Sequence, residues 1–190
     1  LDRAVKLASD LLAYGKTEEA APDVRSLRRA EVLEGAEEEA RLSQDGVRMI
    51  SLVDPADQVV ADPDQLHRIL VNLMRNARQA IEQQAGRESQ GAVQVSLFDE
   101  DGVSVIRLAD NGPGVSERAR ERLFQPFAGS TRPGGAGLGL AIARELAQGH
   151  GGDLSLAETG PQGTVFELRL PGAPTRAPAP KRRRSKSPEG

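Results

Sequence analysis

The sequence has no cysteine and no tryptophan, and its aromatic side chains are limited to four phenylalanines and one tyrosine. Without cysteine the chain can form neither a disulfide nor a thiolate–metal site, which agrees with a reducing cytoplasm. Its two histidines lie far apart in the sequence, which argues against a histidine-based zinc site. No run of about 18 apolar residues is present, so the sequence predicts no membrane-spanning helix. The core must therefore be built from leucine, valine, isoleucine and alanine.

The chain begins inside a helical pattern and lacks the apolar stretch of a signal peptide. Apolar residues recur at helical spacing through residues 1–15, and an acid-rich helical stretch is expected from about residue 24 to 42. After Pro171 the composition changes to proline, alanine, serine, arginine and lysine. The pattern predicts a fragment of a longer protein, in which residues 172–190 are a disordered basic tail with no nucleic-acid partner expected. Attraction of this tail to anionic lipid or nucleic acid is the alternative.

The segment between these ends alternates between strand and helix patterns. One helix is expected from Asp62 to about Ile81, and another from Leu138 to Gly149. A turn is expected at 54–57 between two short strands. The expected strands are 49–53, 59–61, 93–97, 103–108, 153–157 and 164–170.

One candidate site is the segment Asp110-Asn111-Gly112-Pro113-Gly114, which directly follows an expected strand. Asp110 would lie at the strand end, where its carboxylate can accept a hydrogen bond from an exocyclic amine. The glycines allow the backbone to turn tightly and to approach a ligand. Taken alone, the segment is equally consistent with a simple turn.

A second candidate is the glycine-rich segment 134–140, which leads directly into the helix at Leu138. Backbone N–H groups at a helix N-terminus form a phosphate-binding site. No Gly-Lys-Ser/Thr follows, so this is not a Walker loop, and the glycine spacing does not fit a dinucleotide fingerprint. Taken alone, the segment is also consistent with a glycine hinge.

The third candidate is the pair Asn72 and Asn76, which share one helix face because they are four residues apart. Asparagine is a poor helix former, so two copies in mid-helix need a reason. Their amide oxygens can ligate Mg²⁺, which prefers oxygen ligands beside phosphate groups. A solvated helix face is the alternative.

The order of these segments is more specific than any one of them. They occur in succession with Leu123-Phe124-Gln125-Pro126-Phe127 between the last two and Gly163-Thr164-x-Phe166 at the end. In this order, residues 62–171 resemble the catalytic domain of sensor histidine kinases, within the superfamily that includes gyrase, Hsp90 and MutL. The resemblance implies a two-layer α/β (α+β) sandwich of the Bergerat type, with a mixed, mainly antiparallel sheet and helices on one face.

The resemblance also implies roles for individual residues. Asp110 would accept the adenine amino group, with Thr164 supporting it through a water, and Asn76 would ligate Mg²⁺ with help from Asn72. Phe124 and Phe127 would anchor the loop before the glycines. The implied ATP-binding residues are Asn72, Asn76, Asp110, Gly112, Gly114, Arg132, Gly135, Gly137, Leu138, Gly139, Leu140 and Thr164.

The family also implies how the chain is divided. Residues 1–21 resemble the end of a dimerisation helix, 22–45 would be a helical linker, and 46–171 the ATP-binding domain, before the tail at 172–190. The implied partners are the dimerisation and histidine-phosphotransfer helices of the parent protein, a homodimer in its full length, and a response-regulator receiver domain. The site would work in the cytoplasm, in a parent protein that is soluble or anchored in the inner membrane.

Asn72 distinguishes between branches of this superfamily. In the gyrase, Hsp90 and serine-kinase branches, a glutamate four residues before the Mg²⁺ asparagine activates the attacking group. Asn72 is neutral and cannot act as a general base. The sequence therefore favours a histidine kinase over a gyrase-like ATPase, and it predicts no catalytic residue of its own. A degenerate kinase that serves as a nucleotide-binding scaffold is the remaining alternative.

The phosphoacceptor histidine is expected outside this sequence. In the family it lies on the first dimerisation helix, which would precede Leu1. His67 lies on the helix of the nucleotide domain, and His150 lies in the His-Gly-Gly turn after the second glycine-rich helix. Both histidines are expected to be structural.

Overall fold

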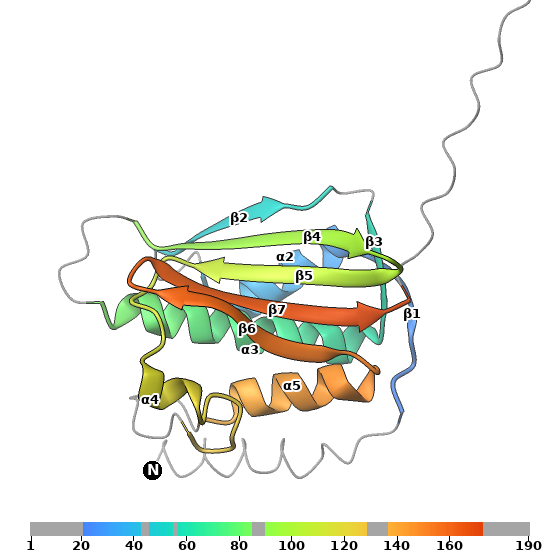
Figure 1. The fold of residues 1–190 in the computed structure, drawn as a ribbon. Coiled ribbons are helices and arrows are strands. Elements are labelled where there is room, and N and C mark those ends of the chain that lie inside the picture. Colours follow the sequence, from blue (N-terminus) through green and yellow to red (C-terminus); the bar gives the residue numbers. More distant parts are fainter. Residues whose placement is uncertain (1–20, 43–45, 55–56, 85–89, 129–136, 173–190) are drawn as a thin grey trace, which may run out of the picture.

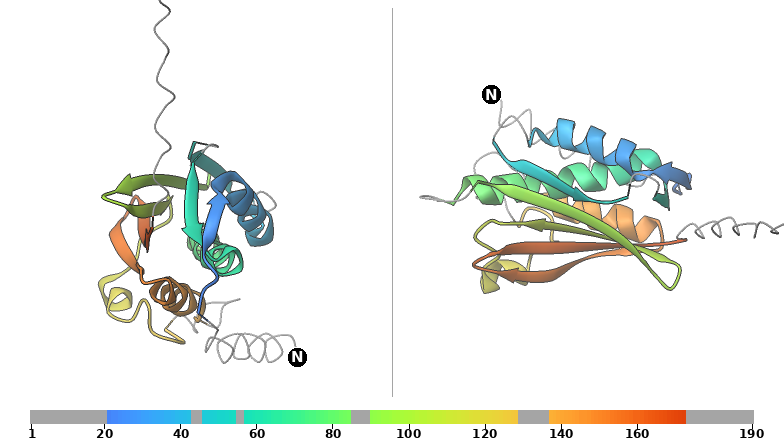
Figure 2. Two further views of the ribbon diagram at one scale, coloured as in Figure 1. Left: turned by 90° about the vertical axis from the view of Figure 1, so that its right-hand side faces the viewer. Right: turned by 90° about the horizontal axis from the view of Figure 1, so that it is seen from above.

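The computed structural model describes residues 21–42, 46–54, 57–84, 90–128 and 137–172. A five-stranded sheet in the order β2-β4-β5-β7-β6 is covered on one face by α3 (Pro63–Glu82) and α5 (Gly139–Gly149), as Figures 1 and 2 show. β2 runs parallel to β4, and the other neighbouring strands are antiparallel. The predicted two-layer sandwich is therefore confirmed. The strands are β2 (Arg48–Leu52), β4 (Ala92–Glu100), β5 (Val103–Asp110), β6 (Asp153–Gly160) and β7 (Gly163–Pro171).

Helix α3 forms because its apolar residues recur at three- and four-residue intervals and meet the sheet on one face. Its start is capped by Asp62, whose Oδ1 accepts hydrogen bonds from the backbone N–H groups of Asp64 and Gln65 at 3.0 and 3.1 Å. Pro63 follows at the first helical position, where no N–H is needed. The buried apolar residues of α3 are Leu66, Ile69, Leu70, Val71, Leu73, Met74, Ala77 and Ile81.

Helix α5 packs antiparallel to α3, and His150 joins the end of α5 to the start of α3. The His150 Nε2 atom accepts a hydrogen bond from Asp62 N at 3.0 Å, so Nδ1 carries the proton that is donated to Leu146 O at 2.8 Å. The other histidine, His67, contacts Glu39 Oε2 at 2.7 Å through Nε2. The structural role expected for His150 is confirmed by these contacts.

The segment before residue 46 differs from the sequence-based expectation. Residues 25–28 form the strand β1 (Arg25–Arg28), antiparallel to β3 (Gln58–Ala61), so the helix expected from residue 24 is wrong in its first turn. Pairing with β3 overrides the local helical preference there. The helix α2 (Arg29–Ala40) follows and buries Leu33 and Ala36 in the core. Through α2, the described residues 22–42 are therefore packed against the rest of the domain, and the division of the chain at residue 45 stays a prediction.

Two further differences concern strands and a short helix. The strands β2 and β3 flank a turn, with Asp57 N donating to Asp54 O at 2.9 Å, but β2 pairs with β4 and β3 pairs with β1. A short helix, α4 (Glu117–Arg120), was not predicted. The helical pattern expected at 1–15 and nearly all of the tail at 172–190 lie outside the described residues. None of the described helices has the length and apolar character needed to cross a bilayer.

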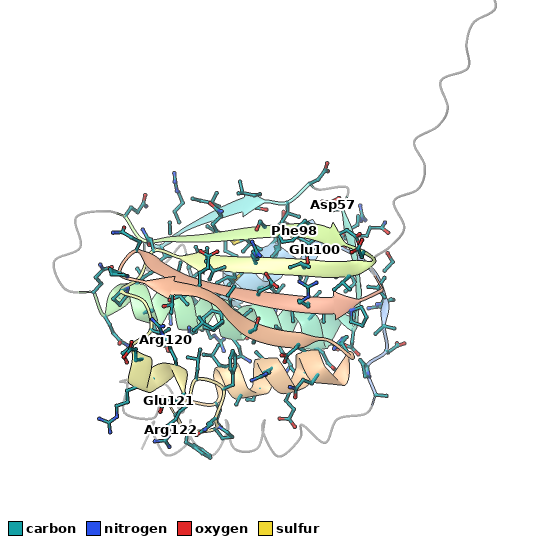
Figure 3. All side chains as sticks on the ribbon, in the orientation of Figure 1. Asp57, Phe98, Glu100, Arg120, Glu121 and Arg122 are labelled. Atoms are coloured by element: carbon teal, nitrogen blue, oxygen red, sulfur yellow. The ribbon has the colours of Figure 1, made fainter. Side chains whose placement is uncertain are left out.

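The face of the sheet that is turned away from α3 and α5 carries linked ion pairs. Arg107 Nε contacts Glu167 Oε2 at 2.7 Å, and Arg169 Nη1 contacts Glu100 Oε2 at 2.8 Å. The Arg107 guanidinium also lies 5.2 Å from the ring centre of Phe98. Figure 3 labels Phe98 and Glu100 near the end of β4. These side chains pair with one another, and the candidate site residues lie elsewhere.

Candidate functional site

The three candidate segments of the sequence meet at one end of the molecule. The end of β5, the turn between β6 and β7 and the start of α5 all lie on the left of Figure 1. The second half of α3 extends toward the same end. The site is therefore built from elements that are distant in sequence, and each contributes a different kind of polar group.

Asp110, the last residue of β5, supplies a buried carboxylate. Its side chain is 7% exposed, and its Oδ1 accepts a hydrogen bond from Gly112 N at 2.8 Å. Burial raises the pKa of Asp110 to about 6, against the opposing effect of neighbouring backbone N–H groups. The other oxygen, Oδ2, is buried and has no hydrogen-bond partner among the described residues. Such an acceptor is ready for a donor from a ligand.

The glycines after Asp110 allow two backbone segments to approach closely. A methyl group built on Gly114, which has φ +80°, would lie 2.2 Å from Gly160 O in the β6–β7 turn. One built on Gly163 would lie 1.8 Å from Asp110 O. Both distances are far below van der Waals contact, so no side chain fits at either position. The β6–β7 turn and the turn after β5 therefore form one packed unit.

The asparagine pair on α3 lies next to the start of α5. A methyl group built on Gly139 would be 3.3 Å from Asn72 Oδ1, so the amide oxygen lies directly beside the backbone of α5. Asn72 and Asn76 are both partly exposed. Among the described residues, neither side chain has a hydrogen-bond partner. Two amide oxygens are therefore available on the face of α3 that meets the helix start.

The first turn of α5 presents backbone N–H groups without a side-chain cap. Its N-cap residue is Leu138, which makes no capping hydrogen bond and is 2% exposed. Gly137 precedes it with φ +71°, and Leu140 packs against the core. Leu138 and Leu140 can thus contribute to a site only through their backbone. An uncapped N-terminus with its positive dipole end attracts an anion such as phosphate.

Two predicted site residues, Arg132 and Gly135, lie outside the described residues. The described residues on the two sides of this segment contact each other, since Phe127 N donates a hydrogen bond to Gly137 O at 3.1 Å. The structure therefore brings together the other predicted residues at one end of α3 and α5, and the roles of Arg132 and Gly135 stay predictions.

The two phenylalanines before the glycine-rich segment behave differently. Phe124 packs edge-to-face on the buried Phe166, with ring centres 6.3 Å apart, and lies 4.8 Å from the guanidinium of Arg144. Arg144 is in turn held by Asp153 at 2.9 Å. Phe127 is 42% exposed, and its backbone has a φ of +64°. Phe124 is therefore packed on the core and Phe127 is partly exposed, and the anchoring of the following loop by these two residues stays a prediction.

Thr164 is buried and pairs with Asp110 in the β5–β7 register. Its hydroxyl lies 3.4 Å from that of Thr159, which also accepts a hydrogen bond from Val115 N at 2.8 Å. Sequence reasoning did not single out Thr159. No local signal marks it, because the contact depends on how β6 and β7 pair.

Asn111 is a second residue that sequence reasoning did not assign. Its Oδ1 accepts from Ala92 N at 2.8 Å, and its Nδ2 donates to Gln90 O at 2.9 Å. Its own N–H donates to Ala92 O at 3.2 Å. Asn111 thus continues the β4–β5 pairing by one step and holds the turn that carries Gly112. Its position between Asp110 and Gly112 was the one feature of the sequence that could have indicated this role.

Residues 61–174 match the family model described as histidine kinase-, DNA gyrase B-, and HSP90-like ATPase. The match covers more than half of the chain. The chain belongs to this family. Together with the similar sensor kinases described next, it identifies an ATP-binding catalytic domain of the histidine kinase type.

Named relatives and a solved structure agree with this assignment. The chain is 40% identical over 113 residues to the C4-dicarboxylate transport sensor protein DctB of Rhizobium meliloti, covering 60% of this chain and 17% of DctB. It is 38% identical over 133 residues to the sensory histidine kinase/phosphatase NtrB of Escherichia coli O157:H7, covering 67% of this chain and 38% of NtrB. The crystal structure of full-length ShkA in complex with AMPPNP aligns with a TM-score of 0.76 and 30% identity, covering 94% of this chain and 38% of ShkA.

Proposed function

We propose that this domain binds Mg²⁺-ATP between α3, α5 and the end of β5, and presents the γ-phosphoryl group to a histidine on a helix of the parent protein. The observation that carries the proposal is the unpartnered, buried Oδ2 of Asp110 at the same end of the molecule as an uncapped helix start. A solved relative, ShkA, was crystallised with the ATP analogue AMPPNP. The chain spans less than two fifths of the length of DctB and NtrB, so the activity of a whole kinase is part of the proposal.

The adenine is recognised at Asp110. Its Oδ2 accepts the exocyclic amino group, while Gly112 N holds Oδ1 and keeps the carboxylate in position. Thr164 supports the purine through a water from the neighbouring strand β7. This arrangement requires an ionised carboxylate, although burial raises the pKa of Asp110 to about 6. Gly114 keeps the turn close enough to the β6–β7 hairpin for these groups to converge.

The phosphates lie against the start of α5. Backbone N–H groups from Gly137 to Leu140 donate to phosphate oxygens, and Arg132 and Gly135 extend this contact in the preceding loop. Asn76 and Asn72 hold Mg²⁺ through their amide oxygens, with Asn72 already beside Gly139. When bound, Mg²⁺ neutralises charge on the phosphate oxygens.

Asn72 limits what the site does with ATP. Its amide has no basic atom, so it cannot remove a proton from water or from a hydroxyl. Phosphoryl transfer depends mainly on placement and charge neutralisation, which this site supplies without a base. An imidazole nucleophile on a partner helix needs no base beside the γ-phosphate. We therefore propose transfer to a histidine, followed by relay to a response-regulator aspartate.

The parent protein supplies the remaining parts in this proposal. Residues 1–21 are the end of a dimerisation helix, and the phosphoacceptor helix belongs to the same homodimer. Residues 46–171 form the ATP-binding domain, with the packed residues 22–42 on its side. The site faces the cytoplasm, where ATP is available.

Isothermal titration calorimetry tests the residue roles. Asn76→Ala should weaken binding of ATP about tenfold in the presence of Mg²⁺ and change it little in the presence of EDTA, since one metal ligand is lost. Asp110→Ala should weaken binding under both conditions. Equal affinity of the two variants and the unmodified chain would overturn the assignment of both residues.

A labelling experiment tests the direction of transfer. Incubated alone with γ-labelled ATP, the chain should acquire no acid-labile phosphate, because His150 is engaged at both ring nitrogens and His67 contacts Glu39. Phosphate found on either histidine would contradict the proposed acceptor. Labelling of a co-purified full-length kinase dimer that carries this domain is the positive control.

A further inference from the structure

The segment 116–128 connects the turn after β5 to the glycine-rich segment, and none of its residues is fully buried. Its helix α4 has no buried side chain. Phe124 packs edge-to-face on the buried ring of Phe166, with ring centres 6.3 Å apart. At the end of the segment, Phe127 N donates to Gly137 O at 3.1 Å. The position of the segment is therefore set by a few contacts with its neighbours and not by a buried core of its own.

Arg144, in the middle of α5, connects Phe124 to the start of β6. Its guanidinium lies over the Phe124 ring, 4.8 Å from the ring centre. Its Nε and Nη2 donate to the two carboxylate oxygens of Asp153 at 2.9 and 3.1 Å. A planar guanidinium can bind a carboxylate through its edge and an aromatic ring through its face at the same time. The carboxylate therefore holds the guanidinium in place over the ring.

The segment is thus attached to α5 at two separate places. The Phe127 hydrogen bond reaches Gly137, directly before the N-cap residue Leu138. The contact of Arg144 with Phe124 lies further along the same helix. One contact alone would let the segment turn about it, whereas two contacts fix its orientation relative to the first turn of α5. The Arg144 contact therefore supports the geometry of the backbone N–H groups that begin α5.

We propose that Arg144 is a positioning residue of the nucleotide site. Through Phe124 it holds the segment 116–128 against α5, keeps the hydrogen bond between Phe127 and Gly137 closed, and so preorganises the first turn of α5 for the phosphates. The inference rests on the proposed ATP site and adds to it a residue that does not touch the nucleotide. Arg144 acts on the phosphate side of the site and leaves the adenine contacts as they are.

Amide hydrogen exchange of the nucleotide-free chain, followed by NMR, tests the structural half of the inference. Arg144→Gln removes the guanidinium and should speed exchange of the Phe127 amide about fivefold, the effect of losing one ring contact and one partly exposed ion pair. The Val115 amide, which donates to Thr159 Oγ1 at 2.8 Å, should exchange at an unchanged rate. Arg169→Gln also breaks the ion pairs of a partly exposed arginine and is the matched control, which should alter neither amide.

Calorimetry with Mg²⁺-ATP tests the functional half. Arg144→Gln should weaken binding about three- to fivefold, because part of the binding free energy is then used to order the first turn of α5. Arg144→Lys keeps the charge and should bind about as weakly, since an ammonium group has no planar fork with which to hold Asp153 and the ring together. Arg169→Gln should bind ATP within about 1.5-fold of the unmodified chain.

The outcomes separate this inference from the proposed function. An unchanged Phe127 amide in Arg144→Gln would overturn the inference, and so would an unchanged affinity of this variant for ATP. Equal acceleration of the Phe127 and Val115 amides would overturn it as well, because Arg144 would then only support the fold. A lysine variant that binds ATP like the unmodified chain would overturn the role of the planar guanidinium. Failure of the unmodified chain to bind ATP would overturn the proposed function and with it the positioning role, whatever the exchange rates.

Discussion

At the end where α3 begins and α5 stops, Asp62 caps the helix start and His150 joins the two helices. At the opposite end, where α5 begins beside Asn72, the helix has no side-chain cap. Nearby, Asp110 keeps a buried oxygen without a partner. The two ends use the same kinds of group, backbone N–H and carboxylate, and differ in whether the protein pairs them.

This difference shows where the domain gains stability and where it retains binding capacity. We call the end with Asp62 and His150 the closed end. Its paired groups contribute to the free energy of unfolding. We call the end with Asp110 and the start of α5 the open end. Its unpaired groups are unfavourable without a ligand, because burial disfavours the charged form of Asp110. A nucleotide that supplies donors and phosphates satisfies them, and binding then stabilises the folded state. A substitution at the open end should therefore weaken nucleotide binding without lowering the free energy of unfolding. A substitution at the closed end should lower the free energy of unfolding and leave binding nearly unchanged.

The largest effect is expected for Asp110→Asn. The amide presents a donor where the adenine amino group needs an acceptor, so ATP affinity should fall about 10- to 100-fold. The free energy of unfolding of the nucleotide-free protein at pH 8 should rise by up to about 3 kcal/mol, because the pKa of the carboxyl is about 6 in the fold against 3.8 unperturbed. Urea denaturation and calorimetry measure both. A variant that is less stable without nucleotide would contradict the view of Asp110 as an unpaired group.

His150→Ala is expected to lower the free energy of unfolding and to leave ATP affinity nearly unchanged. It leaves Asp62 N without its partner and removes the side-chain donor to Leu146 O, so the free energy of unfolding should fall by about 2 kcal/mol. ATP affinity should stay within about twofold, since the open end is not touched. His67→Ala is the matched control and should lose less than about 1 kcal/mol, because its contact with Glu39 is partly exposed. Similar losses in both variants would remove the special role of His150.

Acidification is expected to weaken nucleotide binding through Asp110. The raised pKa means that the carboxylate needed for adenine is lost as pH falls through about 6, and ATP affinity should drop about tenfold between pH 7 and pH 5. The same group makes the nucleotide-free fold more stable as pH falls from above 6 toward 3.8. Calorimetry of the unmodified chain beside Asp110→Asn isolates this contribution. A parallel decline in both proteins would assign the pH dependence to another group.

Asp62→Ala is expected to have the smallest effect of the four. Loss of the N-cap should lower the free energy of unfolding by about 1 kcal/mol, with little change in ATP affinity. Asp64→Ala is the matched control, because this exposed first-turn acid makes no cap and should change stability by only a few tenths of a kcal/mol. Thermal or urea unfolding distinguishes them. Equal stability of the two variants would count against the closed-end interpretation.

Several elements of the fold followed from local chemistry and were correctly predicted. The apolar spacing of α3, the hairpin β4–β5 and the helix after the glycines are all local patterns. The segment carrying Asp110 was recognised because glycine turns after a strand are also local. The family was recognised from the order of such segments, and the match over residues 61–174 agrees with it.

What the tertiary structure decided involves pairing between distant segments. Residues 25–28 form a strand only because β3 lies beside them, and β2 joins the sheet in parallel to β4. A bulge in β6 at Ala157 places Thr159 beside Thr164, and no neighbouring residue in the sequence signals it. The sequence by itself determined which chemical groups are available and where the helices α3 and α5 and most strands form. The three-dimensional fold decided which groups are paired and which remain open, because pairing depends on backbone register across strands and on the packing of helix ends.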